Sequence, residues 1–121
     1  MKKIFLLLSL FSLCFAELSI EDFESDLYSR NGGLKKVELN LKIFGDGLSK
    51  DYILDSLNMV ISSYFYEDLF TEQGKENLKK TLIKYAGKRY SINIDEILII
   101  KLKSKDSAEA IKEILKDANL L

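Results

Sequence analysis

Few residues in this 121-residue chain could carry out acid–base, nucleophilic or metal chemistry. The sequence contains no histidine, the side chain that most often acts as a general base or metal ligand near neutral pH. The single cysteine, Cys14, lies in an apolar N-terminal run, which excludes a disulfide framework and a thiolate zinc site. Ser62 and Ser63 therefore have no histidine to activate them. We expect no catalytic, cofactor-binding or metal-binding residues.

The acidic and glycine motifs also lack the spacing that their chemistry requires. Glu67-Asp68 and Asp95-Glu96 are adjacent pairs, so their side chains point apart and cannot share one substrate. Gly74-Lys75 lacks both the earlier glycine and the following serine or threonine of a phosphate-binding loop. Asp46 lies between two glycines without the further oxygen ligands of a calcium loop. The sequence favours a binding or structural protein over an enzyme.

The composition is that of one small folded domain. Hydrophobic residues make up 47% of the chain and charged residues 31%, as in an ordinary globular protein. The chain has 18 basic and 19 acidic residues, a net charge of −1. This balance argues against a nucleic-acid-binding surface, which would be strongly basic.

Residues 1–16 have the pattern of a secretory signal peptide. Two lysines precede an apolar run over residues 4–16, which is shorter than the roughly 20 residues that span a bilayer. Small residues at Cys14 and Ala16 suit cleavage after Ala16. We therefore expect a periplasmic protein with no membrane span after signal removal. The alternatives are a signal retained as an anchor and a lipid on Cys14, although bulky Leu13 disfavours lipidation.

Hydrophobic periodicity in the mature chain predicts an α+β domain. Residues 17–35 predict a short helix and turn, because three apolar residues share one helical face. Residues 36–44 alternate strictly between apolar and polar, which is typical of a half-buried strand. Helices are expected over residues 50–64 and again from Thr71, whose hydroxyl can cap the free amides of the first turn. Gly87 is expected to end this second helix.

Residues 91–103 give the strongest strand signal. Their apolar phase changes at Asp95-Glu96, which predicts a bulge or a turn there, and residues 97–100 are apolar on both faces, as in a strand covered on both sides. Short loops predict a helix hairpin over a small sheet of two or three mainly antiparallel strands. Residues 104–121 predict an additional amphipathic helix.

The segment between the two predicted helices has a distinctive residue order. Residues 64–78 read Y-F-Y-E-D-L-F-T-E-Q-G-K-E-N-L. This order resembles the signature of the FliL family, the flagellar basal-body-associated proteins of the stator complex. The later residues 94–97 are similar to the paired β-branched residues before the last strand of that family. The matching positions of the signature are Ser62, Ser63, Glu67, Asp68, Leu69, Thr71, Gly74, Lys75, Glu76 and Leu78.

The resemblance implies a FliL-like periplasmic domain over residues 36–103, with a stomatin-like fold. It implies a non-enzymatic structural or scaffold protein of the flagellar motor, at the stator or the basal-body disk. The implied partners are flagellar stator or basal-body proteins and further copies of the chain, in a ring or disk. The chain departs from the family in its cleavable signal, which replaces a transmembrane helix, and in the added residues 104–121.

Six residues are candidates for protein interaction. Four aromatic residues within positions 64–70 are too many to bury fully in so small a domain. A solvated helix face and the apolar chain end supply the others. The six are Tyr66, Phe70, Lys75, Glu76, Leu120 and Leu121. Two alternatives to the motor interpretation stay open: a general periplasmic adaptor without a flagellar role, and a small-ligand-binding protein.

Overall fold

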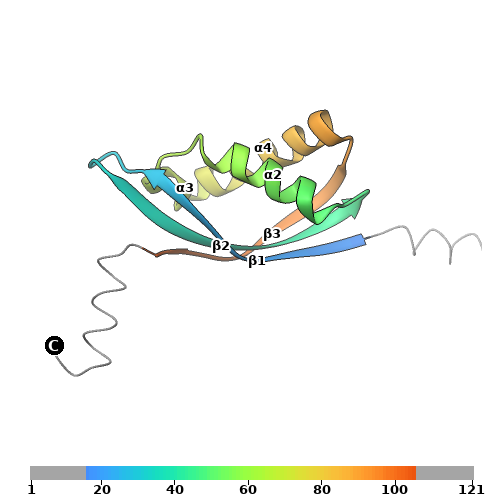
Figure 1. Cartoon of the computed structure of the whole chain (residues 1–121), viewed down its shortest axis with the longest axis horizontal. Coiled ribbons are helices and arrows are strands. Elements are labelled where there is room, and N and C mark those ends of the chain that lie inside the picture. The colour runs from blue at the N-terminus through green and yellow to red at the C-terminus, as the bar shows by residue number, and fades with distance from the viewer. Residues whose placement is uncertain (1–15, 106–121) are drawn as a thin grey trace, which may run out of the picture.

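The computed structural model describes residues 16–105, which form a three-stranded sheet with helices on one face (Figure 1). The α+β class expected from the sequence is confirmed. The strands are β1 (Ala16–Tyr28), β2 (Leu34–Asp46) and β3 (Asn93–Ser104). The helices are α2 (Lys50–Ile61), α3 (Tyr66–Leu69) and α4 (Glu72–Tyr90).

The sheet order is β1-β2-β3, and both pairs of strands are antiparallel. The expected antiparallel pairing of residues 36–44 with residues 91–103 is confirmed, because β2 pairs with β3. A tight turn joins β1 to β2, and Gly32 and Gly33 have φ values of 97° and 78° there. Such angles favour glycine, which has no Cβ to clash with the backbone. Along the chain the three helices come between β2 and β3, and they lie over one face of the sheet (Figure 1).

The short helix expected within residues 17–35 is wrong, because these residues form β1 and the turn after it. The step of three from Ile20 to Phe23 looks helical, but it arises from a β-bulge. Ile20 pairs with Leu41 and Phe23 pairs with Leu39, so two β1 residues oppose Asn40. One of them is Asp22, which has a φ of 56° and donates its amide to Asn40 Oδ1 at 2.8 Å. Away from this bulge the apolar residues follow the two-residue period of a strand.

The hydrophobic core lies between the sheet and the helices. Its sheet side comes from alternate residues of β2, which confirms the strand predicted from their alternation, together with apolar residues of β1 and β3. Its helix side comes from α2 and α4, as their periodicity predicts. The buried residues of these three elements include Val37, Leu39, Leu41, Ile43, Ile53, Leu57, Val60, Ile61, Leu78, Leu82 and Ala86.

Helix α4 does not end at Gly87, as expected, but continues to Tyr90. Ser91 takes the left-handed conformation instead, with a φ of 57°, and its amide donates to the Gly87 carbonyl at 3.1 Å. The additional turn places Tyr90 against Tyr52 of α2, with ring centres 4.3 Å apart. This contact and burial of Ile92 just beyond the helix outweigh the local preference of glycine for a helix end.

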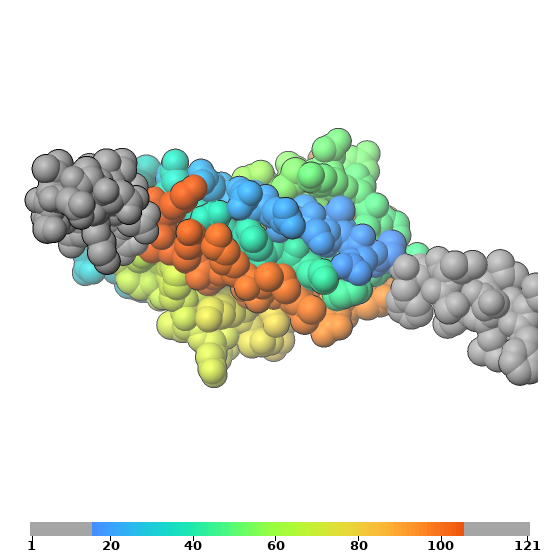
Figure 2. Space-filling view, turned by 90° about the horizontal axis from the view of Figure 1, so that it is seen from below, coloured from blue at the N-terminus to red at the C-terminus, as the bar shows by residue number. Residues whose placement is uncertain are grey.

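The bulge or turn predicted at Asp95-Glu96 is a bulge, but the coverage predicted for β3 is wrong. Asp95 is the additional residue, since Ile94 and Glu96 pair with the consecutive residues Gly45 and Phe44. The helices cover one face only, and the strands lie uncovered on the other face of the described domain (Figure 2). Leu98 is 37% exposed and Ile100 is 59% exposed. Ile100 is a second additional residue, between the residues paired with Leu41 and Asn40.

Both predicted terminal segments reach beyond the described residues. Of residues 1–16, only Ala16 is described, as the first residue of β1. Of residues 104–121, Ser104 ends β3, and Lys105 donates its amide to the Lys36 carbonyl at 2.7 Å. The rest of the predicted C-terminal helix lies outside the described residues.

Candidate functional site

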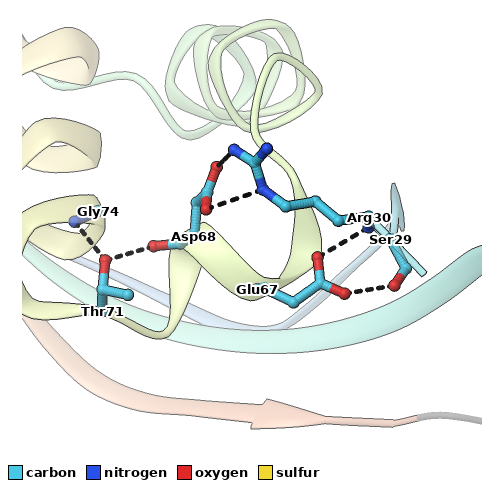
Figure 3. A network of polar contacts seen from close by, with 6 residues as sticks. All are labelled: Ser29, Arg30, Glu67, Asp68, Thr71 and Gly74. Atoms are coloured by element: carbon cyan, nitrogen blue, oxygen red, sulfur yellow. Dashed lines mark hydrogen bonds and ion pairs between the residues drawn. The ribbon is translucent and has the colours of Figure 1, made fainter.

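The acidic pair Glu67-Asp68 holds the end of the β1–β2 hairpin (Figure 3). One Glu67 oxygen accepts a hydrogen bond from the Arg30 amide at 3.0 Å, and the other accepts from the Ser29 hydroxyl. The Arg30 guanidinium reaches Asp68 with two nitrogens, Nη2 at 2.7 Å and Nε at 3.4 Å. The two adjacent carboxylates therefore point to different partners, and both fix the hairpin to α3.

These contacts favour the charged forms of Glu67 and Arg30. The Arg30 amide and then the Ser29 hydroxyl lower the pKa of Glu67, although partial burial acts in the opposite direction. The hydrogen bond to Asp68 and the charge of its carboxylate raise the pKa of Arg30. Glu67 and Arg30 are therefore charged near neutral pH, and their contacts can contribute to stability there.

We expect acid to weaken the fold partly through Glu67. Because its pKa is lowered in the folded chain, its contribution is complete above the ordinary pKa of a glutamate and is lost as the pH falls through the lower folded value. Urea denaturation from about pH 7 to about pH 3 should show this loss. Glu67→Gln should be less stable at neutral pH and less sensitive to acid than the parent chain. An equal acid sensitivity in both chains would contradict the assignment, and Glu21→Gln on the exposed edge of β1 is the control.

Thr71 and Gly74 connect the acidic turn to α4. The Thr71 hydroxyl donates to the Asp68 carbonyl at 2.7 Å and accepts from the Gly74 amide at 2.9 Å, which confirms the predicted cap. A Cβ on Gly74 would lie 1.8 Å from the Asp68 carbonyl oxygen, so only glycine fits. Leu69 precedes Thr71 in the chain and Leu78 follows Gly74, and both leucines are buried. Each of these residues has a structural role.

The aromatic residues of the segment lie beside cations from the hairpin. Tyr66 and Phe70 are half-buried with ring centres 5.1 Å apart, and the Lys35 ammonium lies 5.0 Å from the centre of the Tyr66 ring. The Arg30 guanidinium lies 4.5 Å from the centre of the Phe65 ring, which is 43% exposed. These distances are within the range of cation–π contacts.

The structure divides the six candidate contact residues among different places. Tyr66 and Phe70 lie together near the hairpin end. Lys75 and Glu76 instead line a groove of about 560 Å³ between α4 and β3, together with Glu72, Lys79, Leu98 and Ile99. Leu120 and Leu121 lie outside the described residues. The candidates therefore do not form one site.

Sequence reasoning missed the hairpin residues that complete the first of these places. Ser29 is 38 residues from Glu67, and Arg30 is 37 residues from Glu67 and 38 from Asp68. The only local signal was the Asn31-Gly32-Gly33 turn, which predicts a change of chain direction and no partner. A pairing at this separation depends on the fold and has no periodic signature.

Charged residues on the uncovered sheet face form a compensated network. Glu38 is only 4% exposed, and Lys101 Nζ and Lys103 Nζ each lie 3.5 Å from one of its oxygens. Burial raises the pKa of Glu38, but the charges of the nearby lysines lower it, and the net shift of the pKa is downward. Lys105 and Glu24 form another pair at 2.7 Å. The carboxylates are matched by lysines of neighbouring strands, which favours a structural role for this network.

The described residues offer little for metal chemistry. Between residues 16 and 105, no group of three or more acidic side chains is arranged to hold a metal ion. No helix in this part of the chain is long and apolar enough to cross a membrane.

No protein-family model matches the sequence, and no curated protein is significantly similar to it.

Proposed function

We propose that this protein is a non-enzymatic structural module of the flagellar motor that binds the stator or the basal-body disk in the periplasm, as a FliL-like protein. The observation that carries the proposal is the ordered signature from Ser62 to Leu78. The export signal expected at residues 1–16 is compatible with this location. The absence of histidine from the sequence favours binding over catalysis.

The contacts of the signature residues support the proposal because they explain why these residue types stand at these positions. Glu67 and Asp68 fix the hairpin, Thr71 caps α4, and Gly74 permits the close approach of the Asp68 carbonyl. A three-stranded antiparallel sheet with helices on one face is also compatible with the stomatin-like fold that the resemblance implies.

The surface that we assign to the motor partner is the hairpin end. Tyr28 and Leu34 pair across the hairpin and are exposed on the sheet face turned away from the helices, and Phe65 is exposed on the helix side beneath Arg30, so the surface wraps around the end of the hairpin. Lys35 adds a second cation beside Tyr66. Exposed aromatic residues together with arginine are typical of the energetically important parts of protein interfaces. The hairpin-end surface, defined by Tyr28, Arg30, Leu34, Lys35 and Phe65, therefore suits an apolar and acidic partner.

The proposal is tested in flagellated cells. Deleting the gene should reduce swimming in viscous medium or the number of engaged stators without slowing growth, and a tagged copy should gather at the flagellar bases. Intact-mass analysis of the exported protein should give Glu17 as the first residue.

Phe65→Ala combined with Leu34→Ser should reproduce the swimming defect, because this change removes the apolar part of the hairpin-end surface.

The matched control is Met59→Ser, which changes an exposed apolar side chain on α2, outside the hairpin-end surface. Swimming should be unaffected by that variant. Normal motility in the deletion strain, with the tagged protein spread evenly around the envelope, would overturn the motor assignment and favour a general periplasmic adaptor.

A further inference from the structure

The outer edge of β3 is an exposed apolar surface. β3 is the last strand of the sheet, and no other strand within residues 16–105 pairs with its outer side. Leu98 and Ile100 are exposed on this strand, and the groove of about 560 Å³ lies beside Leu98 and Ile99. Free strand edges with apolar side chains readily add a further strand, because their backbone groups lack partners.

The charges along β3 are arranged so that the strand complements itself. Asp95 and Glu96 precede the apolar residues 97–100, and Lys101 and Lys103 follow them. Neither acidic residue forms an ion pair in the described part of the chain. When two such strands run antiparallel, the acidic end of each lies opposite the basic end of the other, which is the favourable cross-strand arrangement.

The bulge at Ile100 allows this pairing, because it lets paired side chains of the two β3 strands lie on the same face of the joint sheet. Four β3 side chains oppose alternate β2 residues and share the face turned away from the helices: Glu96, Leu98, Lys101 and Lys103. A two-fold axis between Ile99 and Ile100 pairs Glu96 with Lys103 of the second copy, and Leu98 with Lys101. Without the additional residue, this register would pair side chains from opposite faces, because side chains alternate along a strand.

Helix α4 gives an independent indication of the same symmetry. Its side chains Glu72, Lys75, Glu76 and Lys79 line the groove beside Leu98 and Ile99. α4 lies alongside β3 (Figure 2), so this symmetry brings the two α4 helices antiparallel across the groove. The four charged residues of each α4 are then arranged symmetrically about the two-fold axis, which passes beside the helix between Lys75 and Glu76. Glu72 faces Lys79 of the second copy, and Lys75 faces Glu76, so every facing pair has opposite charges.

We infer that two copies of this chain pair through their β3 edges about this two-fold axis, and form one antiparallel sheet of six strands with both α4 helices on the same side. The occupant of the groove is therefore a second copy, and Lys75 and Glu76 are interface residues. The inference does not depend on a motor function, and it uses a surface other than the hairpin end.

The oligomeric state of the purified exported chain tests the pairing. Sedimentation velocity over a concentration series should show a dimer. Lys75→Glu should raise the dissociation constant at least about tenfold, because it places two carboxylates opposite each other at both symmetric positions. Combining Lys75→Glu with Glu76→Lys restores opposite charges and should restore the dimer. Lys80→Glu, an exposed change on α4 outside the groove, is the matched control and should have no effect.

Cross-linking tests the register. The mature chain contains no cysteine, so Ile100→Cys introduces one thiol per copy, beside the proposed axis. A short bismaleimide should join two copies efficiently through this position, and it should not join them through Met59→Cys on α2.

A monomer at all concentrations would overturn the pairing, as would a dimer that Lys75→Glu leaves intact or that cross-links through Glu21→Cys on β1 instead. These measurements use purified protein, so they are distinguishable from a failure of the motor assignment, which is measured by swimming.

Discussion

We expect Leu78→Ala to lower the free energy of unfolding by about 2–5 kcal/mol, because it removes buried methyl groups and leaves a cavity in the core. Leu78 is fully buried on the inner face of α4, in the same row as Leu82 and Ala86. It also follows the capped first turn of α4, so its loss weakens the attachment of the turn over residues 67–74. Urea denaturation followed by circular dichroism measures the change.

The control for this prediction is Met59→Ala, an apolar truncation on an exposed helix position. Met59 is 56% exposed on α2, so its truncation should change the free energy of unfolding by no more than about 0.5 kcal/mol. Equal effects from the two truncations would mean that α4 does not pack on the sheet through Leu78.

The parts of the fold that sequence predicted correctly are those determined by neighbouring residues. The strict alternation of residues 36–44 predicts one buried face, and these residues form β2 with its buried face toward the helices. Thr71 caps α4 as expected, because a cap involves residues within one turn of each other. The bulge at Asp95 is also local, since the change of apolar phase indicates it directly.

The wrong predictions concern residues whose conformation depends on distant partners. Ile20 and Phe23 are three residues apart, which suits a helix, but β2 pairs with both and takes up the additional residue as a bulge. Gly87 has the local character of a helix end, but packing of Tyr90 on Tyr52 extends α4 by another turn. Tertiary contacts outweighed local preference in both cases.

The candidate site could be predicted only where its residues are close in the sequence. The order of Glu67, Asp68, Thr71 and Gly74 is visible without a structure, and so is the solvated position of Lys75 and Glu76 in the predicted helix. The hairpin partners Ser29 and Arg30 are not visible, because their contacts join elements 37 or 38 residues apart. The groove beside β3 also depends on how α4 lies on the sheet. The local sequence pattern predicted the turn before α4, and only the fold showed that this turn binds Ser29 and Arg30 of the hairpin.

We expect Gly74→Ala to destabilise the fold by about 3 kcal/mol, although alanine has the higher intrinsic preference for a helix. The added Cβ would lie 1.8 Å from the Asp68 carbonyl oxygen and 3.0 Å from Thr71 Oγ1. The nearest atom belongs to the backbone, so it can move only if the turn moves with it. That movement also breaks the hydrogen bond from the Gly74 amide to Thr71, which caps the helix. Urea denaturation measures the loss.

The same substitution at Gly87 in the same helix should have the opposite sign. A Cβ there would lie 3.6 Å from its nearest neighbour, the Ile92 carbonyl oxygen, which is an ordinary contact distance. Gly87 lies inside α4, so Gly87→Ala should stabilise the fold by about 0.5–1 kcal/mol, because alanine loses less backbone entropy on folding. Helix preference alone predicts stabilisation at both positions. A stabilising Gly74→Ala would therefore contradict the close approach of the Asp68 carbonyl, and with it the structural reason for a glycine at position 74.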